Sequence, residues 1–287
     1  MDLFKKAIEL MPEEIASELR YFKKSEIEEI RIRLGRKPCV SLAGKEQALS
    51  CKATNGIDIK RLIEKATGAS YHMAEVGLSE GYINYCGLRI GVCGHMSSQR
   101  GQAYSFRSIN TLAIRIAHEC RGIFDDMVQE LYSSGYKNSL IVSAPGGGKT
   151  TAIRELCRLL SEDGERIALI DERNEILADD GMNCFDLGPH CDVLSGVNKA
   201  QGSTMLLRTM NPDIIAMDEI TKQEDVQAVF NIVGCGVSLL ASAHGKDKTE
   251  LGKRKIYREL LDAGVFEYLI TISGYGSRRK YTWEKLM

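Results

Sequence analysis

The most constraining feature of this sequence is a glycine-rich loop between an apolar run and a helical pattern. Residues 143–150 read Ser-Ala-Pro-Gly-Gly-Gly-Lys-Thr, residues 139–142 form the apolar run, and residues 151–156 begin the helical pattern. A strand–loop–helix unit of this kind turns successive backbone N–H groups toward a polyphosphate and adds the positive end of the helix dipole. The sequence therefore predicts a site for a nucleoside triphosphate.

The residues of the loop have separate expected roles. Lys149 is expected to reach the β- and γ-phosphates, and the Thr150 hydroxyl to ligate Mg²⁺. Ser143 stands where the pattern has its first glycine, so the turn has less conformational freedom there. The residues expected to bind the nucleotide are Ser143, Ala144, Pro145, Gly146, Gly147, Gly148, Lys149, Thr150 and Thr151.

Composition indicates a soluble globular protein with no global attraction to nucleic acid. The 287 residues are 27% charged and 44% hydrophobic, and the formal net charge is −1. Residues 1–6 lack the long apolar stretch and the small-residue cleavage site expected of an export signal. Asn231 and glycines interrupt the uncharged segment 226–243, which favours a helix–turn–strand over a membrane span. We expect a cytoplasmic protein, and we interpret the basic runs 246–258 and 278–280 as solvated faces.

The nine cysteines do not form a disulfide framework or a C-x-x-C pair. Most are expected to be small buried apolar residues kept in the reduced state. Zinc binding by Cys184, His190 and Cys191 is a less favoured alternative.

The pattern of elements divides the chain into two domains. In residues 1–136, helical patterns at 2–10, 13–22, 57–67 and 123–133 accompany strand patterns, which predicts a smaller α+β domain. Its strands are expected at 26–34, 40–43, 46–51, 82–85, 88–94, 102–106 and 112–117. In residues 137–287, short apolar strands alternate with helices, which predicts an α/β domain with a mostly parallel sheet covered on both faces. The strands are expected at 139–142, 166–170, 213–217, 237–241 and 267–272, and the helices at 149–161, 198–210, 223–233 and 249–262.

Two acids follow the apolar run 214–217, at the carboxyl end of a predicted inner strand. Ligands of parallel sheets bind at this end, so Asp218 is expected to hold Mg²⁺ and Glu219 to activate the attacking water. A second acidic stretch follows the predicted strand before it. Its members Asp171, Glu172 and Glu175 are either catalytic or part of an ordinary charged loop.

Two further side chains are candidates for contact with the transferred phosphoryl group. His244 closes the next strand, where it could sense the γ-phosphate or a neighbouring carboxylate, although a lone histidine at a strand end is more often structural. Arg208 is a candidate for stabilising charge, from the same chain or a neighbouring subunit, and Arg173, Arg107 and Arg115 are others.

In this order, the motifs resemble those of the secretion ATPases of the type II and type IV systems. The glycine-rich loop is followed by an acidic box at 170–175, by the run Arg208 to Ile215 leading into Glu219, and by a histidine box at 241–245. Asp218 stands where that family has glycine, and Asp171-Glu172 reverses its usual acid order. Over its whole length, including residues 171–176 and 194–196, the chain is similar to the AA proteins of sporulation stage III.

The resemblance implies a RecA-like P-loop ATPase that uses ATP and Mg²⁺. It also implies a homo-oligomer, a hexameric ring, docked from the cytoplasm on a membrane-embedded channel or secretion-like complex between mother cell and forespore. In such rings the N-terminal domain packs over the neighbour's nucleotide, so that Arg89, Arg107 or Arg115 would act in trans.

Three alternatives compete with this interpretation. A transporter-type ATPase is suggested by Leu194-Ser195-Gly196, but Val197 and Asn198 break that signature. A nucleic-acid-dependent RecA-like ATPase would need a basic, aromatic path, which the balanced charge and the single Trp283 argue against. An ATP-gated assembly scaffold with little turnover is compatible with Ser143 and the reversed acidic box.

Overall fold

The computed structural model describes residues 2–68, 77–99, 102–132, 135–179, 181 and 184–286. Contacts divide the chain into two units, Met1–His118 with Ala178–Cys184, and Glu119–Leu177 with Phe185–Met287. The division falls before the expected boundary at 136/137 because helix α5 (Asp125–Leu131) packs in the core of the second unit. Ser133 and Ser134, where the expected helix 123–133 ends, lie outside the described residues.

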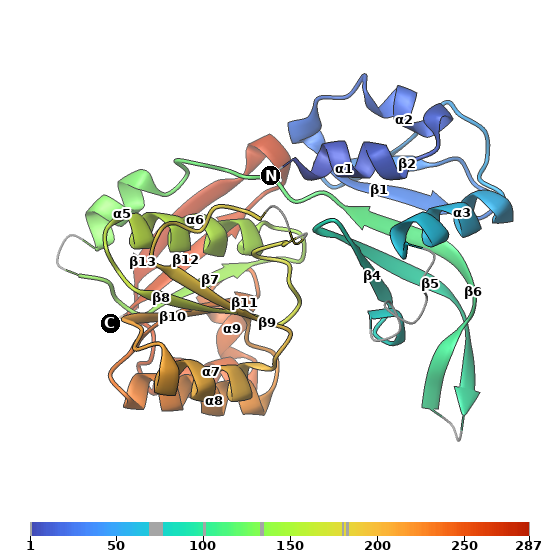
Figure 1. Cartoon of the computed structure of the whole chain (residues 1–287). Helices are drawn as coiled ribbons and strands as arrows, with labels where there is room; N and C mark the ends of the chain where they lie inside the picture. The colour runs from blue at the N-terminus through green and yellow to red at the C-terminus, as the bar shows by residue number, and fades with distance from the viewer. Residues whose placement is uncertain are drawn as a thin grey trace. The chain divides into compact units, whose positions relative to one another are not determined.

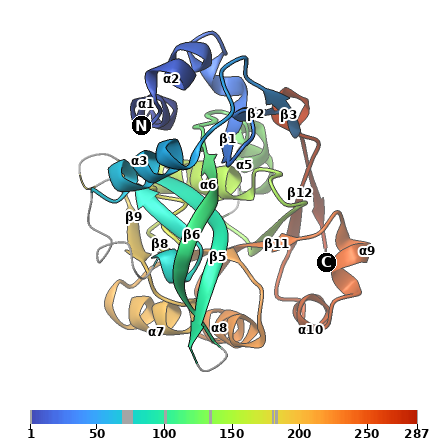
Figure 2. The ribbon, with the colours of Figure 1, turned by 90° about the vertical axis from the view of Figure 1, so that its right-hand side faces the viewer.

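The first unit is an α+β unit with a six-stranded antiparallel sheet, ordered β3-β2-β1-β6-β5-β4. Its strands are β1 (Ile27–Arg33), β2 (Cys39–Leu42), β3 (Lys45–Ala48), β4 (Tyr82–Tyr85), β5 (Leu88–Gln99) and β6 (Gln102–Arg115). Helices α1 (Leu3–Leu10) and α2 (Glu13–Leu19) come first in the chain, and α3 (Gly56–Ala66) lies against β6 (Figure 2). The two strands expected at 102–106 and 112–117 are one long strand, β6.

The second unit is built on a seven-stranded sheet ordered β13-β12-β7-β11-β10-β8-β9. All neighbours in it are parallel except the hairpin pair β12–β13. The strands are β7 (Ser139–Ser143), β8 (Ile167–Asp171), β9 (Cys191–Ser195), β10 (Ile214–Glu219), β11 (Ser238–His244), β12 (Tyr268–Ser273) and β13 (Lys280–Lys285). Every residue of β7 and β8 is buried, as expected of inner parallel strands that are apolar on both faces.

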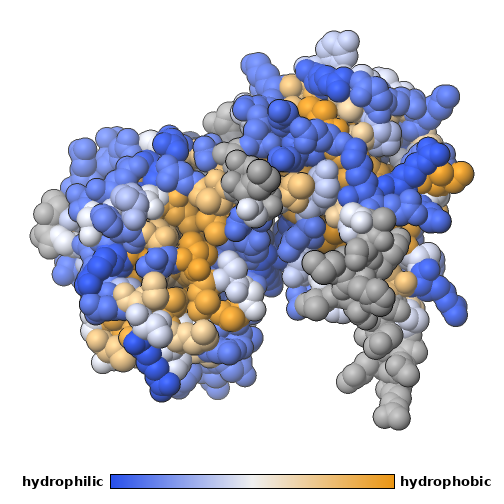
Figure 3. Space-filling model, viewed as in Figure 1, coloured by the Kyte–Doolittle hydropathy of each residue, from blue (hydrophilic) through white to orange (hydrophobic). Residues whose placement is uncertain are grey.

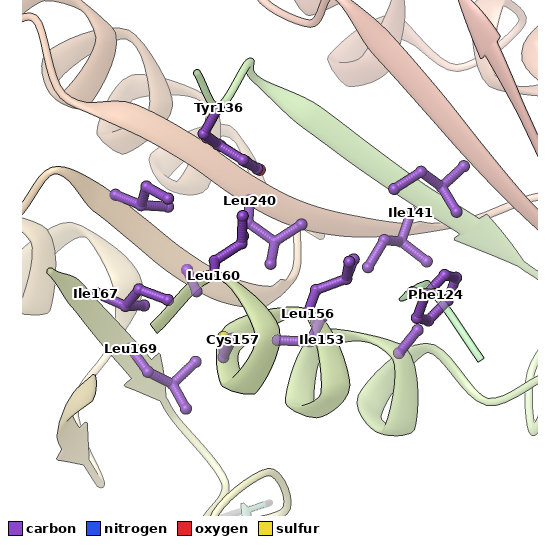
Figure 4. Packing of buried hydrophobic residues seen from close by; sticks show 14 of the residues in the cluster. Phe124, Tyr136, Ile141, Ile153, Leu156, Cys157, Leu160, Ile167, Leu169 and Leu240 are labelled. Atoms are coloured by element: carbon purple, nitrogen blue, oxygen red, sulfur yellow. The ribbon is translucent and has the colours of Figure 1, made fainter. Parts of the chain in front are cut away.

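Helices cover both faces of this sheet (Figure 1). Helix α6 (Lys149–Glu162) and α5 lie on one face, while α7 (Lys199–Thr209) and α8 (Gln223–Gly234) lie side by side on the other. Figure 4 shows Leu156 and Leu160 of α6 among the buried side chains of the first face, with Ile141 of β7 and Leu240 of β11. This packing fixes the start of α6 against the end of β7.

Three differences separate the observed elements of this unit from the expected ones. Strands β9 and β13 were not expected; both are edge strands of mixed polarity, and β13 carries charged residues that suit an exposed edge. The single helix expected at 249–262 is two helices, α9 (Lys248–Gly252) and α10 (Lys255–Asp262). The break follows Gly252, a residue that weakens a helix interior.

The uncharged segment 226–243 folds as expected, as the end of α8 followed by β11. Among the described residues, no helix combines the length and the apolar character that a membrane span requires. Figure 3 shows hydrophobic residues gathered on the viewed face of the second unit. Two exposed large apolar side chains of this unit are Met205, within α7, and Met210, the C-cap residue of that helix.

Candidate functional site

The glycine-rich loop joins the end of β7 to the start of α6, and its backbone requires glycine. Gly146 and Gly148 have positive φ angles of 71° and 105°. Gly147 has no room for a side chain, because an added Cβ would lie 2.5 Å from the Ser143 hydroxyl oxygen and 2.9 Å from the Ala144 carbonyl oxygen. The loop is therefore held in a conformation that other residue types would distort.

Ser143 explains how this loop tolerates its departure from the common pattern. The side chain is fully buried, and its hydroxyl donates a hydrogen bond of 3.0 Å to the carbonyl of Ala144. The same hydroxyl fills the space beside Gly147. Serine is accommodated at the first position because the fifth position has no side chain.

The N-terminus of α6 faces the loop without a side-chain cap. Gly148 is its N-cap residue, and no side-chain hydrogen bond caps the helix within the described residues. By contrast, Asn198 accepts from Gln201 at the start of α7, and Asp247 accepts from Glu250 at the start of α9. An uncapped N-terminus of a 14-residue helix offers backbone N–H groups and a partial positive charge to an anion.

Three residues from separate elements form a hydrogen-bonded chain beside this loop. Lys149 Nζ lies 2.6 Å from Nδ1 of His244, and His244 Nε2 lies 2.7 Å from Oε2 of Glu219. Sheet register explains the convergence: His244 pairs with Ser143 across β11 and β7, and Glu219 pairs with Ser242 across β10 and β11. The carboxyl ends of three adjacent strands thus bring together residues that are far apart in sequence.

The surroundings of these three hydrogen-bonded residues determine their protonation states. Burial lowers the pKa of Lys149 to about 8, although the Glu219 carboxylate opposes the shift. Burial also lowers the pKa of His244, assisted by the positive charge of Lys149 and opposed by Glu219. At neutral pH the imidazole is therefore uncharged, and a proton on Nε2 lets it accept from Lys149 and donate to Glu219.

A second cluster joins the two acidic boxes through Lys199, the first residue of α7. The ammonium group lies 2.7 Å from Asp218 Oδ1 and donates a 2.6 Å hydrogen bond to Glu172 Oε2. Burial raises the pKa of Asp218 to about 6, in spite of the opposing charge of Lys199. Burial alone would lower the pKa of Lys199, but Asp218 and Glu172 raise it above its ordinary value.

Asp171 has a different environment from the other acids. It is fully buried, and its carboxylate accepts three backbone hydrogen bonds of 2.9 Å, from Glu175, Ile176 and Leu177. Burial raises its pKa, and the three hydrogen bonds work against that shift. These contacts make Asp171 the organiser of the loop after β8, while the Glu175 carbonyl is held by Arg154 at 3.1 Å.

Arg208 is not brought to this cluster within the chain. It is exposed in the last turn of α7, whereas Lys199 begins that helix, so the two lie about 13 Å apart along its axis. Three other candidates for action in trans lie in the first unit: Arg89 stacks on the Tyr82 ring at 3.7 Å, and Arg115 Nε lies 3.8 Å from a Glu29 oxygen. The third, Arg107, is exposed on β6.

The cysteines show no metal-binding arrangement in the parts of the chain that the structure describes. There, no group of three or more His, Cys, Asp or Glu side chains is placed to hold a metal ion, and this includes Cys184, His190 and Cys191. None of the nine cysteines forms a disulfide bond in the structure. Several of them, Cys93, Cys184 and Cys235, are exposed, in contrast to the burial expected for most.

Lys199 is a residue of this site that sequence reasoning missed. Its only sequence signal is its place directly after Asn198, a helix-capping residue, following the segment 194–196. A lysine at the first position of a helix is ordinarily a solvated residue. The burial of this one, to 3% exposure, becomes visible only with the fold.

Comparison with known proteins adds a family and a fold. A profile of the family described as "Sporulation stage III, protein AA" matches residues 12–279. Stage III sporulation protein AA of Bacillus subtilis (strain 168) is 31% identical over 275 residues, which are 92% of this chain and 89% of that protein.

Two solved structures share the fold. The Legionella pneumophila ATPase DotB has a TM-score of 0.65 at 14% identity, covering 96% of this chain and 82% of that one. The pilus retraction motor PilT with bound ADP has a TM-score of 0.59 at 16% identity, covering 98% and 81%. By its sequence, this chain belongs to the sporulation stage III AA family.

Proposed function

We propose that this protein is an ATPase of the RecA-like P-loop kind, which uses ATP hydrolysis to drive assembly or transport at a membrane complex during endospore formation. The observation that carries the proposal is the chain Lys149–His244–Glu219 beside the glycine-rich loop. It joins a phosphate-loop lysine to an acid that follows an apolar strand. The two solved structures that share this fold are those of an ATPase and of a motor with bound ADP, which supports the same activity here.

The residues present fit a nucleotide polyphosphate. The loop makes a close turn in which a side chain at Gly147 would collide with Ser143, so this backbone conformation depends on glycine, as it does in phosphate-binding loops. The uncapped N-terminus of α6 and the Lys149 ammonium both favour an anion at this place. The phosphates attract the ammonium, so nucleotide binding is expected to draw Lys149 away from His244.

Thr150 and Asp218 fit Mg²⁺, since a hydroxyl and a carboxylate are oxygen ligands of the type this ion prefers. Mg²⁺ usually binds through one or two protein oxygens together with phosphates and waters, so this site would be completed by the nucleotide. The ion would neutralise charge on the phosphates. Asp218 must release Lys199, or share its carboxylate with it, to take this role.

Glu219 is the group that we assign to the attacking water. His244 holds one of its carboxylate oxygens at 2.7 Å, which fixes the orientation of the acid. A carboxylate oriented in this way accepts the proton of water as it attacks the γ-phosphate, while Lys149 stabilises charge on the phosphate oxygens. Glu172 and Asp171 act as positioning residues, through Lys199 and through the loop after β8. The catalytic roles predicted for Glu175 and Arg208 stay predictions: Glu175 lies in the loop that Asp171 holds, and Arg208 would have to act from a neighbouring copy.

We further propose that the active form is a homo-oligomer, a hexameric ring, at the cytoplasmic face of a membrane-embedded complex on the mother cell side. Arg208 and Met205 share one exposed face of α7, three residues apart, and could meet a neighbouring copy. An arginine contributed between copies would then reach the nucleotide of its neighbour. No direct contact with nucleic acid is part of the proposal.

The contact between Asp218 and Lys199 favours one alternative, an ATP-gated scaffold, because it engages the acid that would serve the metal. Hydrolysis by the wild type, Lys149→Ala and Glu219→Gln separates the two functions, with Lys248→Ala as the matched control at an exposed lysine. The ATPase proposal expects turnover by the wild type and the control, with nucleotide binding retained but hydrolysis lost in Glu219→Gln. Equal inactivity of the wild type and both site variants, with ATP-dependent assembly measured by mass in solution, would establish the scaffold instead.

A further inference from the structure

The basic turn at residues 278–280 lies at the glycine-rich loop, and one of its side chains contacts the loop directly. Arg279 Nη2 donates a hydrogen bond of 3.3 Å to the carbonyl oxygen of Gly146. The same guanidinium packs on Gly148, where an added Cβ would lie 3.3 Å from Nε and 3.6 Å from Cζ. Arg279 is half-buried, so the expectation of a solvated basic run does not hold for this residue.

Topology explains why this turn reaches the loop. Strand β12 is parallel to β7, and Ile272 near its end pairs with Ser143 at the end of β7. The turn that joins β12 to β13 therefore leaves the sheet beside the start of the loop. Its own geometry is fixed by Gly274, which has a φ of 78° and would place a Cβ 2.5 Å from the Arg278 carbonyl oxygen.

The loop is thus flanked by two cations from opposite sides of its strand. The sheet order β12-β7-β11 puts the turn that bears Arg279 on one side and His244, with its partner Lys149, on the other. Lys149 accounts for the β- and γ-phosphates in the proposed function. Arg279 lies against the backbone of Gly146 and Gly148. In loops of this kind the backbone binds the α- and β-phosphates.

We propose that Arg279 binds the β-phosphate of the nucleotide as a second cationic ligand supplied by the same chain. The proposal rests on the proposed function, since it adds a residue to the same site. A guanidinium presents its donors as a planar fork that matches phosphate oxygens, and a charged acceptor binds it more strongly than a carbonyl does. Arg279 is expected to exchange its hydrogen bond to Gly146 for one to the phosphate.

The test measures affinity for ADP, for a non-hydrolysable ATP analogue and for AMP in the full chain. Arg279→Gln is expected to weaken ADP and the ATP analogue alike, by on the order of tenfold, because a hydrogen bond to a charged group is lost from both. AMP, which has no β-phosphate, should bind the variant as it binds the wild type. Arg279→Lys keeps the positive charge but loses the planar fork of donors, so its ADP affinity should lie between those of the wild type and Arg279→Gln.

The matched control is Arg278→Gln, which makes the same change at the exposed neighbour. Unchanged ADP affinity in Arg279→Gln, with thermal unfolding like that of the wild type, would overturn the proposal, as would an equal loss for AMP. Failure of the proposed function would look different, because the wild type would then bind no nucleotide, or Lys149→Ala would bind it normally.

Discussion

Lys199 Nζ lies 2.7 Å from Oδ1 of Asp218, the acid at the end of β10 that we assign to the metal. The lysine is buried and also bonded to Glu172, so one cation joins both acidic boxes of the site. Its charge favours the ionised form of Asp218 against the effect of burial. Without bound metal, Lys199 therefore supplies the positive charge that keeps two neighbouring acids together.

This contact predicts an acid limit on activity. The pKa of Asp218 in the metal-free site is raised to about 6, so below that pH Mg²⁺ must displace a proton to bind this carboxyl. Mg²⁺-dependent ATP hydrolysis by the wild type is expected to fall as pH falls through about 6. Mg²⁺ titrations of the hydrolysis rate across the range from about pH 5 to pH 9 measure this limit.

Lys199→Met tests the origin of that limit. Loss of the ammonium removes the group that favours ionised Asp218, so the acid limit should move to higher pH, and stability should fall by about 2 kcal/mol because two acids lose their partner. Lys248→Met makes the same change at the first residue of α9, which is exposed. It should change neither the pH of the acid limit nor the stability. An acid limit at the same pH in Lys199→Met would show that Lys199 does not control Asp218.

The lowered pKa of Lys149 predicts that nucleotide binding weakens at alkaline pH. Its pKa in the empty site is lowered to about 8 by burial, so the ammonium that meets the phosphates is lost as pH rises above that value. ADP affinity, measured by titration calorimetry, should weaken as pH rises through about 8. In Lys149→Arg the guanidinium stays charged, so any remaining affinity should not decline there. The same alkaline decline in both proteins would assign it to another group.

The contact between Ser143 and Gly147 predicts that substitutions at these two residues have coupled effects on stability. Gly147→Ala should reduce stability by about 1–3 kcal/mol and weaken ADP binding, because its Cβ would lie 2.5 Å from the Ser143 hydroxyl and 2.7 Å from the Ser143 Cβ. Ser143→Gly removes both atoms, so the double variant should recover part of the loss. A double-mutant cycle from urea unfolding measures this coupling.

Gly234→Ala is the control for that cycle. Gly234 closes α8, has open space where a Cβ would be added, and does not have a positive φ, so alanine should be neutral or slightly stabilising there. Additive effects of Ser143→Gly and Gly147→Ala would mean that the two residues do not share the space that the structure assigns to them.

Much of this fold could be predicted because local signals and tertiary packing agree. The apolar runs of β7, β8 and β10 are inner parallel strands, and such strands are apolar throughout. The edge strands β9 and β13 have no such run, since one face of each meets solvent and its pattern resembles a polar loop. Their pairing is a property of the sheet rather than of the local sequence.

The candidate site also contains some residues that the sequence predicts and others that only the fold reveals. The structure brings Lys149, Glu219 and His244 together, and each of these follows or begins an element that the sequence marks clearly. Lys199 and Arg279 carry no such mark, because a single basic residue at a helix start or in a turn is common on protein surfaces. Only the register of β12 and the start of α7 reveal that they face the loop and the acids.

The contacts of Asp171 predict that this acid stabilises the loop after β8 and does not contact the nucleotide. Asp171→Asn replaces a carboxylate that accepts hydrogen bonds from Glu175, Ile176 and Leu177 with an amide that has one acceptor oxygen. The amide NH₂ would face backbone donors, so we expect a loss of about 2–4 kcal/mol in the free energy of unfolding, measured with urea.

Asp192→Asn makes the same change at an exposed position of the neighbouring strand β9 and should change stability by less than about 0.5 kcal/mol. Because Asp171 only positions the loop in this account, the folded variant should retain ADP binding within a few-fold of the wild type. A variant of normal stability with no hydrolysis would instead place the Asp171 carboxylate at the reacting phosphate. Stability and binding measured on the same preparations therefore decide which role this acid has.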